Sequence, residues 1–177
     1  MGRDGMWAIN MIVHKTYERF DAELDLICEY KPRIVITALG SPRRPLDRVH
    51  AYGGAVFCDV ITPEQARKAV DAGADGLILV ASGAGGHTGQ YSPFALVEEV
   101  RGFWDGPLVL GGAIGHARAI QAALMLGADF AYRPRKYSRW RMPRAPVAIS
   151  RQPRRPIARS SPTLILRFEQ RRVSVSG

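Results

Sequence analysis

The 177-residue chain has few cysteines and no long apolar run, and each absence excludes a class of protein. Cys28 and Cys58 do not form a CxxC pair and have no histidines at metal-site spacing, which argues against a disulfide scaffold and a zinc site. We interpret both as reduced thiols of a cytoplasmic protein. No stretch reaches the roughly 18 apolar residues of a membrane helix, and the N-terminus lacks a signal-peptide pattern. We therefore predict a soluble globular protein with no membrane partner and no bound metal.

Acidic residues are almost absent from the last quarter of the chain. Residues 133–177 hold one acid, Glu169, against 13 Lys and Arg, a net charge of +12. Residues 1–132 hold 15 Asp and Glu against 12 Lys and Arg, a net charge of −3. The composition therefore predicts a folded domain over 1–132 and a separate Arg-, Pro- and Ser-rich tail over 133–177.

Two interpretations of this tail stay open. A disordered basic arm can bind nucleic acid by neutralising phosphates, but the tail lacks interleaved aromatic residues, so we do not expect a nucleic-acid partner. Alternatively, Arg, Pro and Ser are the residues that out-of-frame translation of a GC-rich gene tends to produce. We favour a frameshift near codon 133, which predicts that another reading frame past that codon encodes the end of a strand and a helix.

Short apolar segments alternate with amphipathic segments throughout residues 1–132. Continuously hydrophobic runs predict strands buried on both faces at 7–13, 34–39, 55–60, 76–80, 108–110 and 129–132. Helical periodicity predicts helices at 18–30, 46–52, 114–126 and after the Thr62-Pro63 and Ser92-Pro93 pairs, which have N-cap and first-turn chemistry. This alternation is typical of an α/β protein with a parallel sheet.

A barrel and a doubly wound sheet both fit this alternation, and a repeated turn favours the barrel. Ala72-Gly73-Ala74-Asp75 and Leu126-Gly127-Ala128-Asp129 each join a helix to a strand. We predict an incomplete (β/α)8 TIM-barrel fold of about six β/α units, because only six strands are visible and a closed barrel has eight.

Residues 76–89 join an apolar run to a glycine-rich loop that holds one histidine, His87. Glycine lets main chain approach a bulky ligand, and histidine titrates near neutral pH. The functional hypothesis is a general base at the mouth of a barrel, where catalytic groups gather. The alternative is a loop histidine that only hydrogen-bonds neighbouring backbone groups.

A second glycine pair, Gly111-Gly112, follows a strand and precedes a helix, which is the arrangement of a phosphate-binding loop. If the preceding strand is the seventh of a barrel, a matching loop should follow the eighth at Tyr132. Arg133-Pro134 stands there instead, and proline lacks the N–H that such a loop needs. Half of the expected phosphate site is therefore missing.

Other polar residues are weaker candidates. Asn10 lies within an apolar strand and either hydrogen-bonds a ligand at the barrel mouth or is a tolerated core amide. Three histidines have little local support for a functional role: His14, His50 and His116. Tyr91 and Ser92 follow the His87 loop and are either substrate-pocket residues or helix-capping residues.

These motifs together resemble one known family. The segments Trp7-Ala8-Ile9-Asn10, Ala84-Gly85-Gly86-His87-Thr88-Gly89 and Gly111-Gly112-Ala113-Ile114 occur in the order and spacing of the nitronate monooxygenases, formerly 2-nitropropane dioxygenases. The resemblance covers about residues 5–132. It implies an FMN-dependent TIM barrel that oxidises alkyl nitronates with molecular oxygen.

The resemblance also implies roles for individual residues. It makes His87 the base that takes the α-proton from a nitroalkane. It makes Asn10, Gly85, Gly86, Gly111 and Gly112 contacts to FMN. It places the six strands as family strands three to eight, so that the first two would lie upstream of Met1, and we expect the activity of such a chain to be impaired. A flavin-dependent enoyl-acyl-carrier-protein reductase is the alternative, because that family is similar and shares the glycine–histidine loop.

Overall fold

The computed structural model describes residues 7–85 and 88–132, in which strands and helices strictly alternate. The predicted tail over 133–177, with the frameshift hypothesis attached to it, lies outside the described residues. The elements are, in chain order, β1 (Ala8–Ile12), α1 (Phe20–Tyr30), β2 (Ile34–Ala38), α2 (Arg43–Ala51), β3 (Ala55–Val60), α3 (Pro63–Asp71), β4 (Gly76–Val80), α4 (Pro93–Arg101), β5 (Leu108–Gly111), α5 (Ala117–Met125) and β6 (Phe130–Tyr132).

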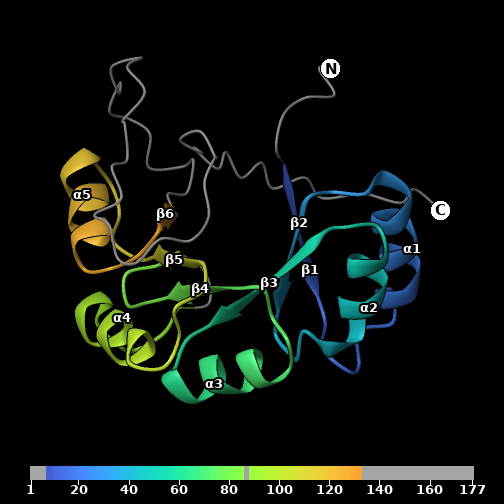
Figure 1. The fold of residues 1–177 in the computed structure, drawn as a ribbon, viewed down its shortest axis with the longest axis horizontal. Coiled ribbons are helices and arrows are strands. Elements are labelled where there is room, and N and C mark those ends of the chain that lie inside the picture. The colour runs from blue at the N-terminus through green and yellow to red at the C-terminus, as the bar shows by residue number, and fades with distance from the viewer. Residues whose placement is uncertain (1–6, 86–87, 133–177) are drawn as a thin grey trace.

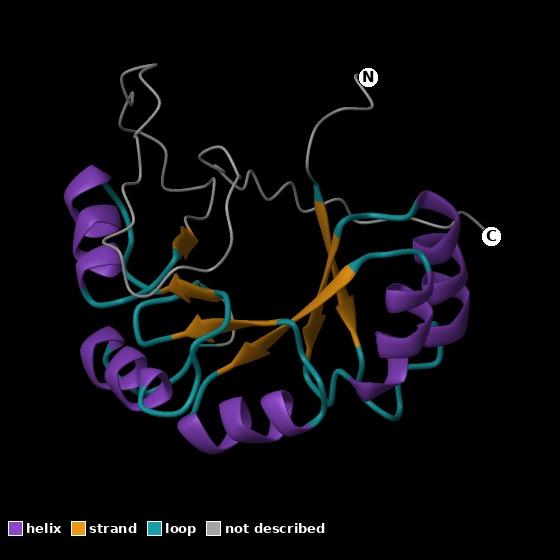
Figure 2. Ribbon diagram, viewed as in Figure 1, coloured by secondary structure: helices purple, strands orange, loops and turns teal. Residues whose placement is uncertain are grey.

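All neighbouring strands pair in parallel, and their order across the sheet is the order along the chain, β1-β2-β3-β4-β5-β6. The sheet is curved, and the five helices of the described part lie along its outer side (Figure 1 and Figure 2). A doubly wound sheet reverses its strand order and carries helices on both faces, whereas a barrel does neither. The barrel type predicted from the repeated turn is therefore confirmed.

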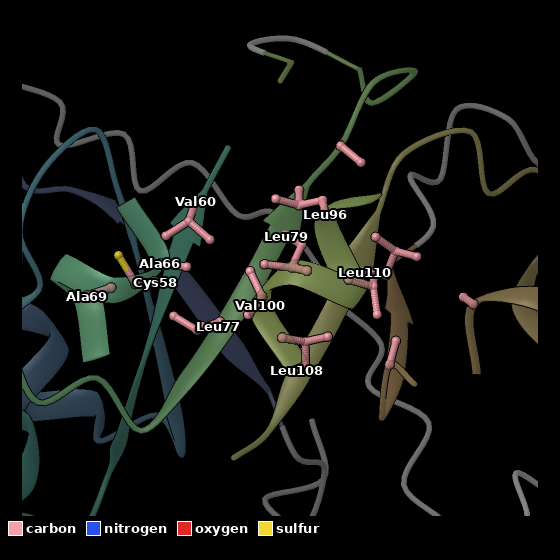
Figure 3. Packing of buried hydrophobic residues seen from close by; sticks show 14 of the residues in the cluster. Cys58, Val60, Ala66, Ala69, Leu77, Leu79, Leu96, Val100, Leu108 and Leu110 are labelled. Atoms are coloured by element: carbon pink, nitrogen blue, oxygen red, sulfur yellow. The ribbon is translucent and has the colours of Figure 1, made fainter. Parts of the chain in front are cut away.

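Strands β1 to β5 bury side chains on both of their faces, as the continuous apolar runs predicted, and the residues of β6 are partly buried. On the outer face, Leu77 and Leu79 of β4 are fully buried in the cluster that also holds Leu96 and Val100 of α4 (Figure 3). On the opposite side lies a second cluster, which we call the inner face. Its buried members are Ala8, Ile34, Ile36, Phe57, Ile78 and Val109. Because side chains alternate along a strand, each strand contributes to both layers.

Helices α3 and α4, whose first turns are capped by a side chain, begin where the sequence predicted, whereas α2, which has no such cap, begins elsewhere. Thr62 and Ser92 accept hydrogen bonds from the backbone N–H groups of Gln65 and Ala95, as their N-cap positions predicted. Helix α2 begins three residues before the predicted position 46, because its N-cap is Pro42 and no side chain marks the start.

Helix α5 begins at Ala117 rather than at the predicted position 114. Its N-cap is His116, so the two residues before that belong to the preceding loop. Both cysteines are free thiols, Cys58 buried and Cys28 partly buried, as expected. No helix within the described ranges is long and apolar enough to cross a bilayer.

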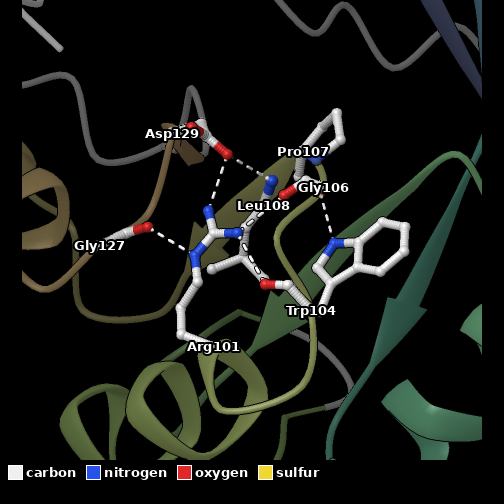
Figure 4. Close-up of polar contacts among 7 residues, drawn as sticks. All are labelled: Arg101, Trp104, Gly106, Pro107, Leu108, Gly127 and Asp129. Carbon is white, nitrogen blue, oxygen red and sulfur yellow. Dashed lines mark hydrogen bonds and ion pairs between the residues drawn. The ribbon is translucent and has the colours of Figure 1, made fainter. Parts of the chain in front are cut away.

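The repeated turns lie at the edge of the sheet where the strands begin. We call this the N-terminal edge. The Asp129 carboxylate accepts from the backbone N–H of Leu108 at 2.9 Å and from the Arg101 guanidinium at 2.8 Å (Figure 4). Arg101 also donates to the carbonyls of Trp104, Gly106 and Gly127. This partly buried network ties α4 to the start of β5 and β6.

Candidate functional site

The loops after β4 and β5 are joined to each other at the opposite edge of the sheet, which we call the C-terminal edge. The backbone N–H of Ala113 donates to the Gly83 carbonyl at 3.0 Å, and that of Ala81 donates to the Gly111 carbonyl at 2.8 Å. The described parts of the two glycine motifs that the sequence singled out are therefore joined by backbone hydrogen bonds and lie side by side. Catalytic and ligand-binding groups of barrels gather at this edge.

The loop that carries the predicted base is anchored on both sides of it. The Thr88 hydroxyl donates to the Ala81 carbonyl at 3.0 Å, and the Gly89 N–H donates to the Val80 carbonyl at 3.2 Å. Gly86 and His87 lie outside the described residues, so their predicted roles stay predictions. The anchors nevertheless fix where the chain leaves β4 and where it returns.

The glycines of these loops fall into two groups. Some are required by packing between loops: a Cβ on Gly83 would lie 3.0 Å from the Ala113 Cβ, and one on Gly112 would lie 2.9 Å from the Ser82 carbonyl oxygen. Both also have positive φ, at +82° and +134°. Their presence is explained without a ligand.

Gly85 and Gly115 form the second group, because among the described residues a Cβ on either meets no atom within 4 Å. Gly111 is the last residue of β5 and lies two residues after Val109, so it is on the same inner face. Ala113 has a φ of 52°, a left-handed conformation that costs energy for a residue with a Cβ. Open main chain and local strain therefore coincide at the C-terminal edge.

Two polar residues lie on the inner face beneath these loops. Asn10 follows Ala8 by two residues on β1, and Asp59 follows Phe57 by two residues on β3, so both share the inner alternation. The Asn10 side chain hydrogen-bonds the Asp59 carboxyl. Burial nevertheless raises the pKa of Asp59 from its ordinary value of 3.8 to about 7, since the hydrogen bond only partly offsets the loss of solvent.

Sequence reasoning identified Asn10 but missed Asp59. The signal was present: Asp59 is the one charged residue in the apolar run of β3 and stands in register opposite Ile78 of β4. A carboxyl in that position is expensive to bury and therefore calls for a functional explanation.

The remaining sequence candidates have structural partners. His14 lies 2.8 Å from the Thr16 hydroxyl, and His116 caps α5 through a 3.4 Å contact with the Ala119 N–H. His50 Nε2 lies 2.8 Å from the Asp75 carboxylate, at the N-terminal edge and so away from the glycine loops. Ser92 caps α4, as described above, and Tyr91 packs against the outer-face cluster.

A family model of the nitronate monooxygenases matches residues 5–132. The chain belongs to the nitronate monooxygenase family. Among curated relatives, the nitronate monooxygenase of Pseudomonas aeruginosa is 35% identical over 116 residues, which cover 60% of this chain and 33% of that protein. The nitronate monooxygenase of Neurospora crassa is 35% identical over 102 residues, covering 52% and 27%. The chain thus spans about a third of the length of these relatives.

Solved structures agree with this nitronate monooxygenase assignment. The nitroalkane oxidase of Streptomyces ansochromogenes superposes with a TM-score of 0.59 at 31% identity, covering 63% of this chain and 36% of that one. FabK from Thermotoga maritima superposes with a TM-score of 0.66 at 28% identity, covering 72% and 40%. The family match also ends at residue 132, where the composition of the chain changes.

Proposed function

We propose that this chain supplies the FMN-binding part of an enzyme that oxidises alkyl nitronates with molecular oxygen. The observation that carries the proposal is the family match over residues 5–132, which includes both loops of the C-terminal edge. The similarity to a nitroalkane oxidase structure supports the same substrate class. The substrates are then a small nitronate and O2.

The residues at the C-terminal edge suit a flavin phosphate and ring. We assign FMN contacts to Asn10, Gly85, Gly86, Gly111 and Gly112. A Cβ on Gly85 would meet no other described atom within 4 Å, and Gly111 brings buried main chain without a side chain to the inner face. At the start of α5, His116 caps the Ala119 N–H, and the first N–H groups of the helix are the ones we assign to the FMN phosphate. When bound, FMN supplies the electron transfer from substrate to O2.

His87 is assigned the proton transfer. An imidazole is a suitable base for a carbon acid beside a nitro group, because histidine exchanges protons near neutral pH. A neutral nitroalkane must lose its α-proton before oxidation, whereas a nitronate has already lost it. If His87 is the base, its replacement should slow the oxidation of a neutral nitroalkane but not that of a preformed nitronate.

The test compares His87→Asn with His50→Asn, a matched substitution at the N-terminal edge. Nitrite release is measured with FMN present, using a neutral nitroalkane and its preformed nitronate. We expect His87→Asn to lower kcat/KM for the nitroalkane by about 100-fold or more while sparing the nitronate, and His50→Asn to change neither.

Two results would contradict the proposal. Equal activity of His87→Asn on both substrates would remove the base assignment. Oxidation of a nicotinamide cofactor with an enoyl thioester, without nitrite release from any nitro compound, would instead support the enoyl reductase alternative.

A further inference from the structure

Asp59 is the one acidic side chain on the inner face within the described ranges, and its surroundings are mostly apolar. It pairs in register with Ile78 of β4 and follows Phe57, both members of the inner-face cluster. A carboxyl placed there loses solvent without gaining an opposite charge. An aspartate at position 59 therefore lowers the stability of the fold, so stability does not explain its presence.

Polar groups reach Asp59 from both edge strands of the sheet. Asn10 of β1 hydrogen-bonds the carboxyl. Tyr132 ends β6, and the pKa of its hydroxyl is raised first by burial and further by the negative charge of Asp59. Three residues that are distant in sequence therefore form one polar group, which we call the inner polar cluster (Asn10, Asp59 and Tyr132). A carboxyl has about four acceptor sites, so one amide does not saturate it.

The inner polar cluster adjoins the loop that carries the predicted base. Asp59 lies two residues before Ile61, and a Cβ on Gly89 would lie 3.1 Å from the Ile61 carbonyl oxygen and the same distance from its Cβ. The chain after β3 thus packs directly on the loop after β4. A small molecule held beneath that loop would lie within reach of the inner polar cluster.

We propose that Asp59 is a substrate-binding residue whose protonated carboxyl donates a hydrogen bond to an oxygen of the nitro group, with Asn10 holding the carboxyl in place. The inference rests on the proposed function, because the nitro compound comes from it. An ionised carboxylate would repel nitro or nitronate oxygens, whereas a neutral carboxyl donates to them. Burial favours the neutral form near neutral pH, since it raises the pKa of Asp59 to about 7.

The test uses 2-methyl-2-nitropropane, a nitro compound without an α-hydrogen, which can bind but cannot form a nitronate. Its dissociation constant is measured with the full chain and FMN from about pH 5 to about pH 9. We expect binding to weaken about 5- to 10-fold as the Asp59 carboxyl ionises. Asp59→Asn keeps a donor and cannot ionise, so its binding should stay constant with pH. All other groups are the same in the two proteins, so the difference between the two profiles isolates Asp59.

A second measurement needs no variant. Carbon-13 NMR of the labelled Asp59 carboxyl gives its pKa with and without the nitro compound. Because the ligand prefers the protonated form, saturation with it should raise that pKa, and an unchanged or lowered value would overturn the inference even if Asp59→Asn does not fold.

The outcomes separate this inference from the proposed function. If the chain releases nitrite from nitronates but binds the nitro compound equally at all pH values, the role of Asp59 is wrong and the function stands. If Asp59→Asn binds the compound but loses turnover of neutral nitroalkanes only, Asp59 is a base rather than a hydrogen-bond donor. If no nitro compound binds or reacts at any pH, both proposals fail.

Discussion

The turns at the N-terminal edge of the sheet and the loops at its C-terminal edge contain similar residues in different roles. At the N-terminal edge, positive-φ glycines such as Gly73 and Gly127 end helices, and the aspartates that follow them accept backbone N–H groups of the preceding strand. At the C-terminal edge, Leu39 and Ala113 also take positive φ, although they are not glycines. At the N-terminal edge Lys31, which ends α1, has a φ of 49°, so strained residues occur at both edges. The edges differ instead in their contacts: aspartate carboxylates hold the turns at the N-terminal edge, whereas backbone hydrogen bonds join the loops after β4 and β5 at the C-terminal edge.

The N-terminal edge should show the largest loss of stability. Arg101→Ala removes the side-chain donor to three carbonyls and one of the donors to the Asp129 carboxylate in a partly buried site, so we expect a loss of about 2–4 kcal/mol in the free energy of unfolding. Urea denaturation measures it. His50→Ala removes the equivalent partner of Asp75, but that pair is exposed, and its loss should cost less than about 1 kcal/mol. Equal losses would show that the two turns do not differ as described.

Two glycine substitutions at the C-terminal edge should separate packing from ligand contact. Gly112→Ala places a Cβ against the Ser82 carbonyl at a φ of +134°, so we expect a loss of about 1–3 kcal/mol in stability. Gly85→Ala meets open space and should leave stability within about 0.5 kcal/mol while weakening FMN binding. Denaturation and a flavin fluorescence titration on both variants check this. A destabilised Gly85→Ala with normal FMN binding would reverse the assignment.

The inner polar cluster predicts an unusual dependence of stability on pH. The pKa of Asp59 is raised to about 7 in the folded chain, so between about pH 4 and about pH 7 the folded state holds the proton that the unfolded state has lost. The contribution of Asp59 to the free energy of unfolding therefore falls as pH rises through this window. Asp59→Asn should be more stable than the parent by about 2 kcal/mol above that window, and equal to it below. Urea denaturation at several pH values tests this, and a variant less stable above the window would contradict it.

The smallest effect is expected at Leu39, in the loop after β2. Its side chain is 51% exposed and its φ is 62°, so glycine would relieve strain while losing little packing. We expect Leu39→Gly to gain about 0.5–1 kcal/mol, because relief of the left-handed conformation exceeds the added entropy of the unfolded chain. A clear loss of stability would show that Leu39 packs in a way that its exposure conceals.

The fold was largely predictable because its signals are local. Apolar runs marked every strand, and Thr62 and Ser92 marked helix starts, since an N-cap acts within one turn. The start of α2 was not predictable in the same way, because Pro42 offers no side-chain cap. The barrel type followed from a repeated turn, and the strand order then confirmed it.

The candidate site was predictable only in part, because its central contacts are between distant residues. The sequence showed two glycine motifs but not that the Ala113 N–H binds the Gly83 carbonyl, which gives Gly83 a packing role. Asn10 and Asp59 are joined only when β1 and β3 lie in one curved sheet. Local periodicity carries no information on such pairs.

The most direct test of the account asks which edge of the sheet binds FMN. Backbone amide signals of a nitrogen-15-labelled chain are followed by NMR during titration with FMN, with glycines as reporters at both edges. We expect shifts at Gly85, Gly111 and Gly112 and none at Gly53, Gly73 and Gly127. Shifts confined to the second set, or no shift at either edge at saturating FMN, would contradict it.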